Sequence, residues 1–248
     1  MYILLGGIKP LVGAVMGKKS TRIYMGGCNW RCGYCYVPEI LDKKNCQRVN
    51  LSECVYLLQQ IKGMEAVEIT GGEPTNQSKE LEALCRVCKQ EGWLVKVHSN
   101  GSNPGGIGDL ITGNLVDVVA LDIKAPLKDE RMYSFITQKK VDTQKVRESI
   151  GLAHLTSFNG FFEVVIPILP GINDKPGIIT KICKDINYCD SLVLRGFDPN
   201  HDLVGKKWKE EKPPTHNTLL KLAKVGRDAL YNVDIVMIES VEKGIETI

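Results

Sequence analysis

The sequence lacks a long uninterrupted hydrophobic run, the feature expected of a membrane-spanning helix or of the apolar part of a signal peptide. The first fifteen residues, MYILLGGIKPLVGAV, are apolar, but glycines, Lys9 and Pro10 interrupt them and no charged segment precedes them. We therefore expect neither an export signal nor a membrane span, and we expect a cytoplasmic location.

The chain also has little net charge. The net charge is +3 and the pI is about 8.3, and the lysine pairs are scattered at 18–19, 43–44, 139–140 and 206–207. This pattern favours solvated surfaces over a nucleic-acid-binding stripe. The 248 residues contain no internal repeat, low-complexity tract or linker, and 43% of them are hydrophobic and 25% charged. These values are ordinary for a globular protein, so we expect a single domain over residues 1–248.

Nine cysteines occur without an export signal, and they do not indicate a disulfide framework because the cytosol keeps thiols reduced. Cys54, Cys85, Cys88 and Cys183 fall in the i, i+3, i+4, i+7 spacing of apolar helical stripes. Free cysteines in such stripes are small apolar core residues. Cys46 and Cys189 lie in less periodic segments that assign them no role.

Apolar periodicity alternates between strand and helix along the chain. Strands are expected at 21–27, 66–71, 94–100, 116–124, 161–169, 191–198 and 233–240, and helices at 51–62, 77–91, 105–113, 143–157, 176–187 and 215–230. The segments 36–50, 125–142 and 199–214 look irregular. The runs VVALDI, VVIPIL and VDIVMI are apolar on both faces, as in a parallel sheet covered by helices. The predicted fold class is α/β, with an open doubly wound sheet or a full or partial barrel as the alternatives.

The chemistry is expected at Cys28, Cys32 and Cys35, whose spacing allows three sulfurs to converge on one centre. Thiolates select zinc, copper(I) or iron-sulfur clusters. Structural zinc prefers four protein ligands, and no fourth Cys or His stands at knuckle spacing. An iron-sulfur cube held by three cysteines keeps one iron free for another ligand.

This spacing, with Tyr34 before the last cysteine, resembles the signature of the radical S-adenosylmethionine (radical SAM) superfamily. Gly71-Gly72-Glu73-Pro74 resembles the GGEP motif of that superfamily, although an isolated pair of glycines is more often an ordinary strand-to-helix turn. The resemblance covers about residues 20–200. It implies a partial (β/α)6 barrel with parallel strands, which a helix and a strand at 213–241 complete.

Polar residues end the third and fourth strands. Ser99-Asn100-Gly101 resembles the Thr-Asn-Gly of glycyl-radical-enzyme activases, which often have an acidic residue where His98 stands here. His98 is equally a core histidine or a ligand. Strand alternation places Asp122 and Lys124 on one face. They are either a structural ion pair or, by resemblance to the activases' Asp-x-Lys motif, contacts for the amino and carboxylate groups of SAM.

Arg195, in the sixth strand, either faces the barrel lumen and meets an anionic cofactor or substrate, or lies on the surface. Two departures from the activases bear on the substrate. The fifth strand lacks their usual arginine, and Tyr36-Val37-Pro38 stands in place of His-Asn-Pro.

The resemblance implies a [4Fe-4S] cluster on Cys28, Cys32 and Cys35, with SAM bound on its open iron. The residues it implies for SAM are Tyr34, Gly71, Gly72, Glu73, Ser99, Asn100, Asp122 and Lys124. Arg195 is a further candidate for contact with SAM, from its place in the sixth strand rather than from a family motif. Reductive cleavage of SAM would yield a 5'-deoxyadenosyl radical that abstracts hydrogen. The expected substrate is a glycyl radical enzyme such as anaerobic ribonucleotide reductase, with flavodoxin or ferredoxin as electron donor.

Two alternatives remain open. The first is a radical SAM enzyme for a small molecule or nucleotide, such as a deazapurine synthase, although the Cys-Asp-Thr sequence common in those enzymes is absent. The second is a metal-binding module that recognises RNA or protein and takes zinc.

Overall fold

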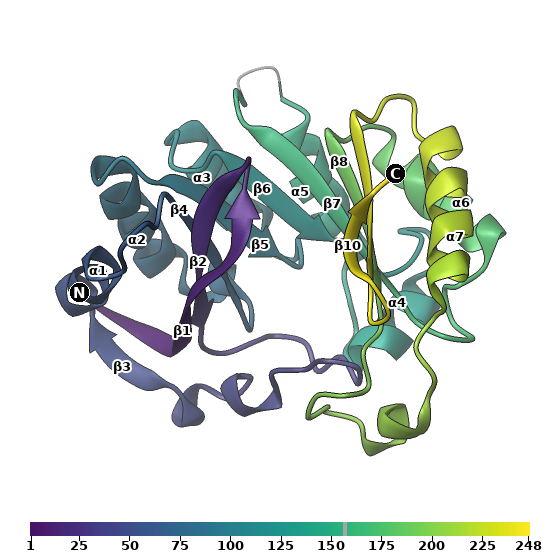
Figure 1. The fold of residues 1–248 in the computed structure, drawn as a ribbon, viewed down its shortest axis with the longest axis horizontal. Helices are drawn as coiled ribbons and strands as arrows, with labels where there is room; N and C mark the ends of the chain where they lie inside the picture. The colour runs from purple at the N-terminus through teal and green to yellow at the C-terminus, as the bar shows by residue number, and fades with distance from the viewer. Residues whose placement is uncertain (156–157) are drawn as a thin grey trace.

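A ten-stranded sheet organises the computed structural model, which describes residues 1–155 and 158–248. The strand order is β10-β9-β8-β7-β6-β5-β4-β2-β1-β3. The parallel strands are β2 (Lys18–Met25), β4 (Ala66–Gly71), β5 (Leu94–Ser99), β6 (Val118–Asp122), β7 (Phe161–Ile168), β8 (Ser191–Gly196) and β9 (Ile235–Ser240). The sheet does not close on itself (Figure 1). The predicted α/β fold with parallel strands is therefore confirmed, in its open form.

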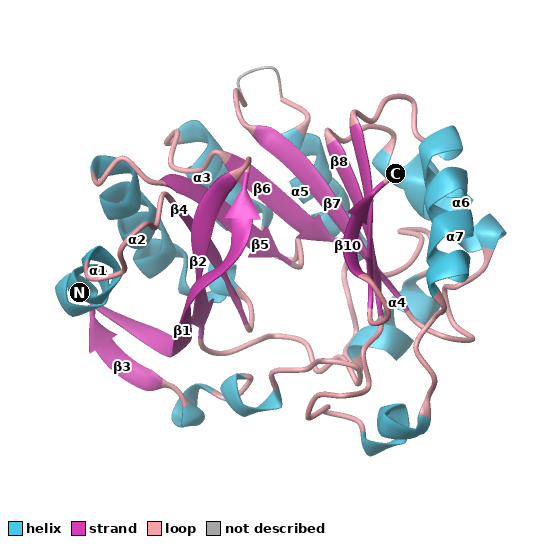
Figure 2. Cartoon of the chain, viewed as in Figure 1, coloured by secondary structure: helices cyan, strands magenta, loops and turns pink. Residues whose placement is uncertain are grey.

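Helices connect the parallel strands and cover the outer face of the sheet (Figure 2). They are α1 (Leu51–Gln59), α2 (Ser78–Gln90), α3 (Pro104–Thr112), α5 (Thr143–Ala153), α6 (Pro176–Ile186) and α7 (His216–Ala229). The side chains of Asn103, Asp142 and Thr215 accept backbone N–H bonds at the starts of α3, α5 and α7, which fixes where these helices begin. All six predicted helices are present with shifted ends. The last two positions of the predicted helix 143–157 lie outside the described residues.

The expected strict alternation of strand and helix is wrong at both edges of the sheet. Strands β1 (Tyr2–Val15), β3 (Gln47–Asn50) and β10 (Gly244–Thr247) are antiparallel additions. The β1–β2 hairpin turns at Met16 and Gly17, both with positive φ, as a two-residue hairpin turn requires. Register shifts on either side of residues 7–9 interrupt the ladder of β1, so its apolar period is irregular.

The stretches expected to be irregular also contain regular structure. β3 ends the segment 36–50, and α4 (Glu130–Thr137) lies in 125–142. Short 3₁₀ helices occupy Pro38–Ile40, Lys43–Asn45, Pro74–Gln77 and Lys206–Glu210. Both β3 and α4 are short, and their stability depends on tertiary packing more than on local periodicity.

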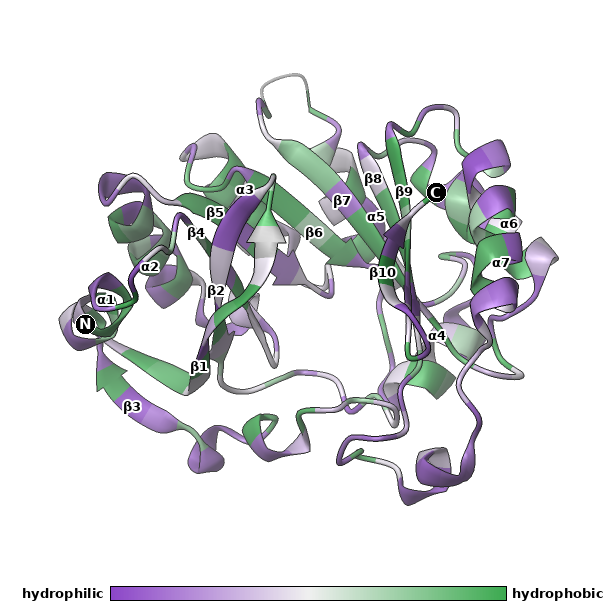
Figure 3. Ribbon diagram, in the orientation of Figure 1, coloured by the Kyte–Doolittle hydropathy of each residue, from purple (hydrophilic) through white to green (hydrophobic). Residues whose placement is uncertain are grey.

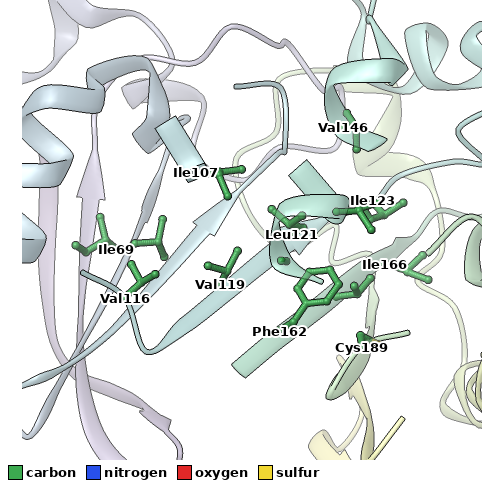
Figure 4. Close-up of a cluster of buried hydrophobic side chains, with 14 of the residues drawn as sticks. Ile69, Ile107, Val116, Val119, Leu121, Ile123, Val146, Phe162, Ile166 and Cys189 are labelled. Carbon is green, nitrogen blue, oxygen red and sulfur yellow. The ribbon is translucent and has the colours of Figure 1, made fainter. Parts of the chain in front are cut away.

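The main core lies between the sheet and the helices. Leu121 of β6 is fully buried in one cluster with Ile69 of β4, Ile166 of β7 and Ile107 of α3 (Figure 4). Each such side chain contributes about 1.5–3 kcal/mol relative to an exposed one. In Figure 3 the hydrophobic colour runs along β6 and β7, as a sheet apolar on both faces requires.

The cysteines outside the motif follow the core. The predicted core positions Cys54, Cys85, Cys88 and Cys183 are confirmed as fully buried, and Cys189 is buried with them. No helix in the described part of the chain is both long and apolar enough to cross a membrane.

Candidate active site

A cavity of about 480 Å³ lies at the carboxyl ends of the parallel strands. In α/β barrels this end carries the chemistry, because the loops that follow the strands meet there. Every predicted site residue lines the cavity: Cys28, Cys32, Tyr34, Cys35, Gly71, Gly72, Glu73, Ser99, Asn100, Asp122, Lys124 and Arg195. The fold thus brings together residues separated by up to 167 positions, from 28 to 195.

The cysteine loop that follows β2 is held by backbone hydrogen bonds to three distant segments. The Cys28 amide donates to the Leu41 carbonyl (3.1 Å), and the Arg31 amide donates to the Thr137 carbonyl (2.9 Å). The Gly33 carbonyl accepts from the Gly205 amide (2.8 Å). The loop is therefore positioned before any ligand binds, as a preorganised site requires.

The three thiols of this loop line the same cavity. Burial raises the pKa of Cys28 to about 12, and those of Cys32 and Cys35 to about 11. A neighbouring thiol adds to the increase at each position: Cys32 acts on Cys28, Cys35 on Cys32, and Cys28 on Cys35. The positive charge of Lys124 lowers all three pKa values in part, so it favours the thiolates that bind metal.

This donor set suits an iron-sulfur cluster better than a single ion. Zinc draws all its ligand atoms to within about 2.3 Å of one centre, whereas each cysteine of a cube binds a different iron. Within residues 1–155 and 158–248, no three His, Cys, Asp or Glu side chains converge on one ion position. Three thiols that line one cavity fit a cluster with one iron left free.

The two glycines after β4 allow the backbone to pass close to the cysteine loop. The φ of Gly71 is +124°, and a Cβ there would lie 2.5 Å from the Met25 nitrogen. A Cβ on Gly72 would lie 2.5 Å from the carbonyl carbon of Gly27. Only glycine permits this approach, which the Glu73 amide completes by donating to the Gly27 carbonyl (2.8 Å).

The carboxyl group of Glu73 connects the ends of β4 and β5. It is buried, and it accepts hydrogen bonds from the Ser99 hydroxyl (2.8 Å) and the Asn100 amide (2.7 Å). The hydroxyl and amide of Thr75 also donate to it (2.6 and 3.1 Å). Burial raises the pKa of Glu73, and the hydrogen bonds from these donors lower it by less, so the pKa lies above its usual value. Three of the predicted cofactor residues, Glu73, Ser99 and Asn100, thus form one hydrogen-bonded group.

Asp122 and Lys124 both face the cavity, as the strand alternation predicts. The Lys124 ammonium lies 3.4 Å from the Asp122 carboxylate and 5.5 Å from the centre of the Trp30 ring. Burial alone would lower the pKa of Lys124, but the charge of Asp122 raises it well above its usual value. The distance is long for a hydrogen bond, so both groups retain hydrogen-bonding capacity toward the cavity.

His98 and Arg195 line the other side of the cavity. The His98 ring nitrogen Nε2 lies 2.6 Å from a Glu68 carboxylate oxygen, so this histidine has a hydrogen-bond partner within the sheet. The Arg195 guanidinium, which is not on the outer surface, pairs with Glu239 of β9 (2.5 Å).

Sequence reasoning missed Trp30, which also lines the cavity. Trp30 is 4% exposed and packs edge-on against Tyr133, and the predicted residue Tyr34 packs in the same way against Trp208. The position of Trp30 inside the cysteine motif was the available signal. Cys46, for which the sequence indicated no role, lies outside the cavity lining and donates to the Ile40 carbonyl (3.5 Å).

The profile of the Radical SAM superfamily matches residues 23–179, more than half of the chain. This protein belongs to the radical SAM superfamily. Membership implies SAM and a [4Fe-4S] cluster as cofactors, and the cavity combines the thiols and strand ends that such cofactors require.

Relatives of two kinds are similar to this chain. A Methanocaldococcus jannaschii protein, provisionally named a glycyl-radical enzyme activating enzyme, is 29% identical over 239 residues, 95% of this chain and 96% of that protein. The pyruvate formate-lyase-activating enzyme of Clostridium pasteurianum is 25% identical over 199 residues, 77% of this chain and 79% of its own. A 7-carboxy-7-deazaguanine synthase of M. jannaschii is 24% identical over 196 residues, 73% and 76% of the two chains.

Among solved structures, TYW1 with a lysine-pyruvate adduct bound has the same fold. The TM-score is 0.64 at 16% identity, with 93% of this chain and 80% of that chain covered. This likeness supports the open α/β architecture and carries no further statement about the reaction.

Proposed function

We propose that this protein activates a glycyl radical enzyme by abstracting hydrogen from a backbone glycine of its partner. The observation that carries the proposal is the convergence of the three thiols, the Gly71-Gly72 turn and the Asp122–Lys124 pair on one cavity. The names of the two activase relatives support the substrate class.

Cys28, Cys32 and Cys35 would hold the cluster. When bound, the cluster and SAM supply reductive cleavage that yields a 5'-deoxyadenosyl radical. Lys124 would donate to the carboxylate of SAM, and Asp122 would accept from its amino group. The backbone at Gly71 and Gly72 lies open to the cavity beside them. Ser99, Asn100 and Tyr34 would complete the SAM site, and a donor protein such as flavodoxin or ferredoxin would supply the electron.

The position of the cavity supports a protein substrate. Its lining extends from Val12 of β1 to Glu239 of β9, which lie toward opposite edges of the open sheet. No strand of the described chain joins these two edges. A segment of a partner chain would enter the cavity between these two edges. The apolar rings of Trp30, Tyr34 and Phe197 would limit water near the reacting atoms.

A second candidate is hydrogen abstraction from a small molecule or nucleotide. The observation that favours it is the similarity to a 7-carboxy-7-deazaguanine synthase over about three quarters of both chains.

Isotope transfer separates the two candidates. The protein is reconstituted anaerobically with iron and sulfide, reduced with SAM present, and given either a partner peptide deuterated at glycine or a deuterated metabolite. We expect deuterium in 5'-deoxyadenosine from the peptide alone. Transfer of deuterium only from the metabolite would overturn the proposal. The control is Cys32→Ala, which removes one cluster ligand and should transfer no deuterium from either substrate.

A further inference from the structure

Two arginines of the cavity are not accounted for by the cofactor motifs. Arg22 of β2 and Arg195 of β8 both line the cavity. Each makes one ion pair through its Nε atom, Arg22 with Glu68 (2.7 Å) and Arg195 with Glu239 (2.5 Å). Within residues 1–155 and 158–248, Arg195 makes no further hydrogen bond. The Tyr24 side chain also interacts with Arg22. The Nη atoms of Arg195 therefore retain their donors, and Arg22 retains those that Tyr24 does not engage.

Both side chains stay charged and stay accessible from the cavity. Burial disfavours the cations, but Glu68 and Glu239 raise the pKa values of Arg22 and Arg195 above their usual range. The side chains are 27% and 31% exposed. A guanidinium whose Nε is already engaged still presents its Nη pair, which matches the two oxygens of a carboxylate or phosphate.

The two arginines come from distant strands and face one space. Strands β4, β5, β6 and β7 lie between β2 and β8 in the sheet. Nevertheless both cations act on the Tyr36 hydroxyl: burial raises the pKa of Tyr36, and the charges of Arg195 and Arg22 oppose that increase. Arg22, Arg195 and Tyr36 all line the same cavity, so the curvature of the sheet brings both guanidinium groups to it.

We propose that Arg22 and Arg195 form a subsite for an acidic group of the substrate, a carboxylate or phosphate, held through their Nη donors. This inference rests on the proposed function and deepens it. In a glycyl radical enzyme, the acidic group would be an Asp or Glu side chain near the target glycine. In a small-molecule substrate, it would be the acid of the metabolite. Arg195 then serves the substrate rather than SAM.

Binding without turnover tests the subsite. The reconstituted, unreduced protein with SAM is titrated calorimetrically with two probe pairs: the peptide Ala-Glu-Gly-Ala against Ala-Gln-Gly-Ala, and succinate against succinamide. We expect at least about a tenfold preference for the acid over the amide in one pair, the effect of one charge-assisted hydrogen bond. Arg22→Gln and Arg195→Gln should each reduce the preference toward parity.

Matched variants separate charge, geometry and folding. Arg22→Lys and Arg195→Lys retain the positive charge but lose the paired Nη donors of the guanidinium. They should give an intermediate preference for the acid over the amide. Arg86→Gln removes an arginine of α2 that pairs with Glu82 outside the cavity, and it should leave the preference unchanged. Glu239→Gln removes the internal competitor of Arg195 and should tighten binding of the acid. Circular dichroism and melting temperature identify any variant that fails to fold.

The outcomes distinguish the subsite from the proposed function. Preference for the acidic peptide supports both. Preference for succinate alone supports the subsite and counts against a protein substrate, which the deuterium transfer decides independently. No preference in either pair, or a preference that survives both Arg→Gln changes, overturns the subsite. If Arg195→Gln weakens SAM binding and leaves the acid preference intact, Arg195 belongs to the cofactor and the subsite is wrong.

Discussion

Replacing Gly72 by alanine tests whether the end of β4 positions the cysteine loop. A Cβ at this position would lie 2.5 Å from the carbonyl carbon of Gly27 and 3.0 Å from the amide nitrogen of Cys28, and closer still to the Gly27 oxygen. Ordinary contacts between carbon atoms begin near about 3.5 Å, so the two backbone segments must separate by about 1 Å. All three opposing atoms are backbone, and no side chain can rotate away.

The separation has a direct consequence for the metal site. It breaks the hydrogen bond from the Glu73 amide to the Gly27 carbonyl (2.8 Å) and moves Cys28, which adjoins the displaced residue. Overpacking of this kind costs about 1–3 kcal/mol of stability. We expect Gly72→Ala to lower the iron and sulfide content after anaerobic reconstitution. We also expect it to weaken SAM binding at least about tenfold, the equivalent of about 1.4 kcal/mol.

Gly151→Ala is the matched control. Gly151 lies in α5 with no atom within 4 Å of its added Cβ, so alanine should stabilise the helix by up to about 1 kcal/mol. Urea unfolding measures both stabilities, and equilibrium dialysis measures SAM binding. If Gly72→Ala keeps the iron content and SAM affinity of the unmodified protein, the close approach of the two segments does not position Cys28 and our reasoning is refuted.

Three further changes test the other parts of the site. Lys124→Met should reduce SAM affinity about 10- to 100-fold, since it removes a charge-assisted hydrogen bond of about 1.5–3 kcal/mol; unchanged equilibrium dialysis would contradict the assigned role. Glu73→Gln should lower the unfolding free energy by about 1–3 kcal/mol in urea, because an amide cannot accept from both the Thr75 and Asn100 N–H groups; an unshifted midpoint would argue against it. The ion pairs of Glu68 hold its pKa well below the usual range despite burial, so its stabilisation is present above the unfolded value of about 4.3 and is lost as the pH falls toward the folded value. The melting temperature should therefore fall less between pH 7 and pH 3 in Glu68→Gln than in the unmodified protein, and parallel curves would count against this contribution.

Local patterns explain why much of the site was predictable. The apolar runs at β6, β7 and β9 indicated a parallel sheet, and parallel strands bring their carboxyl ends to one edge. Polar residues at those ends, such as Asp122 and Lys124, were therefore expected near Cys28, and all of them line one cavity. The antiparallel strands β1, β3 and β10 escaped prediction because glycines, bulges or short length obscure their period.

The sequence by itself determined the order of the seven parallel strands and of six helices, because this order follows from apolar periodicity along the chain. It also determined the three-cysteine motif, whose spacing resembles the signature of the superfamily. Only the tertiary structure decided which distant residues meet. The pairing of Arg195 with Glu239, the His98–Glu68 contact and the approach of Gly72 to Gly27 depend on strand register and on the curvature of the sheet. Packing across the whole domain sets both quantities, and no short segment records them.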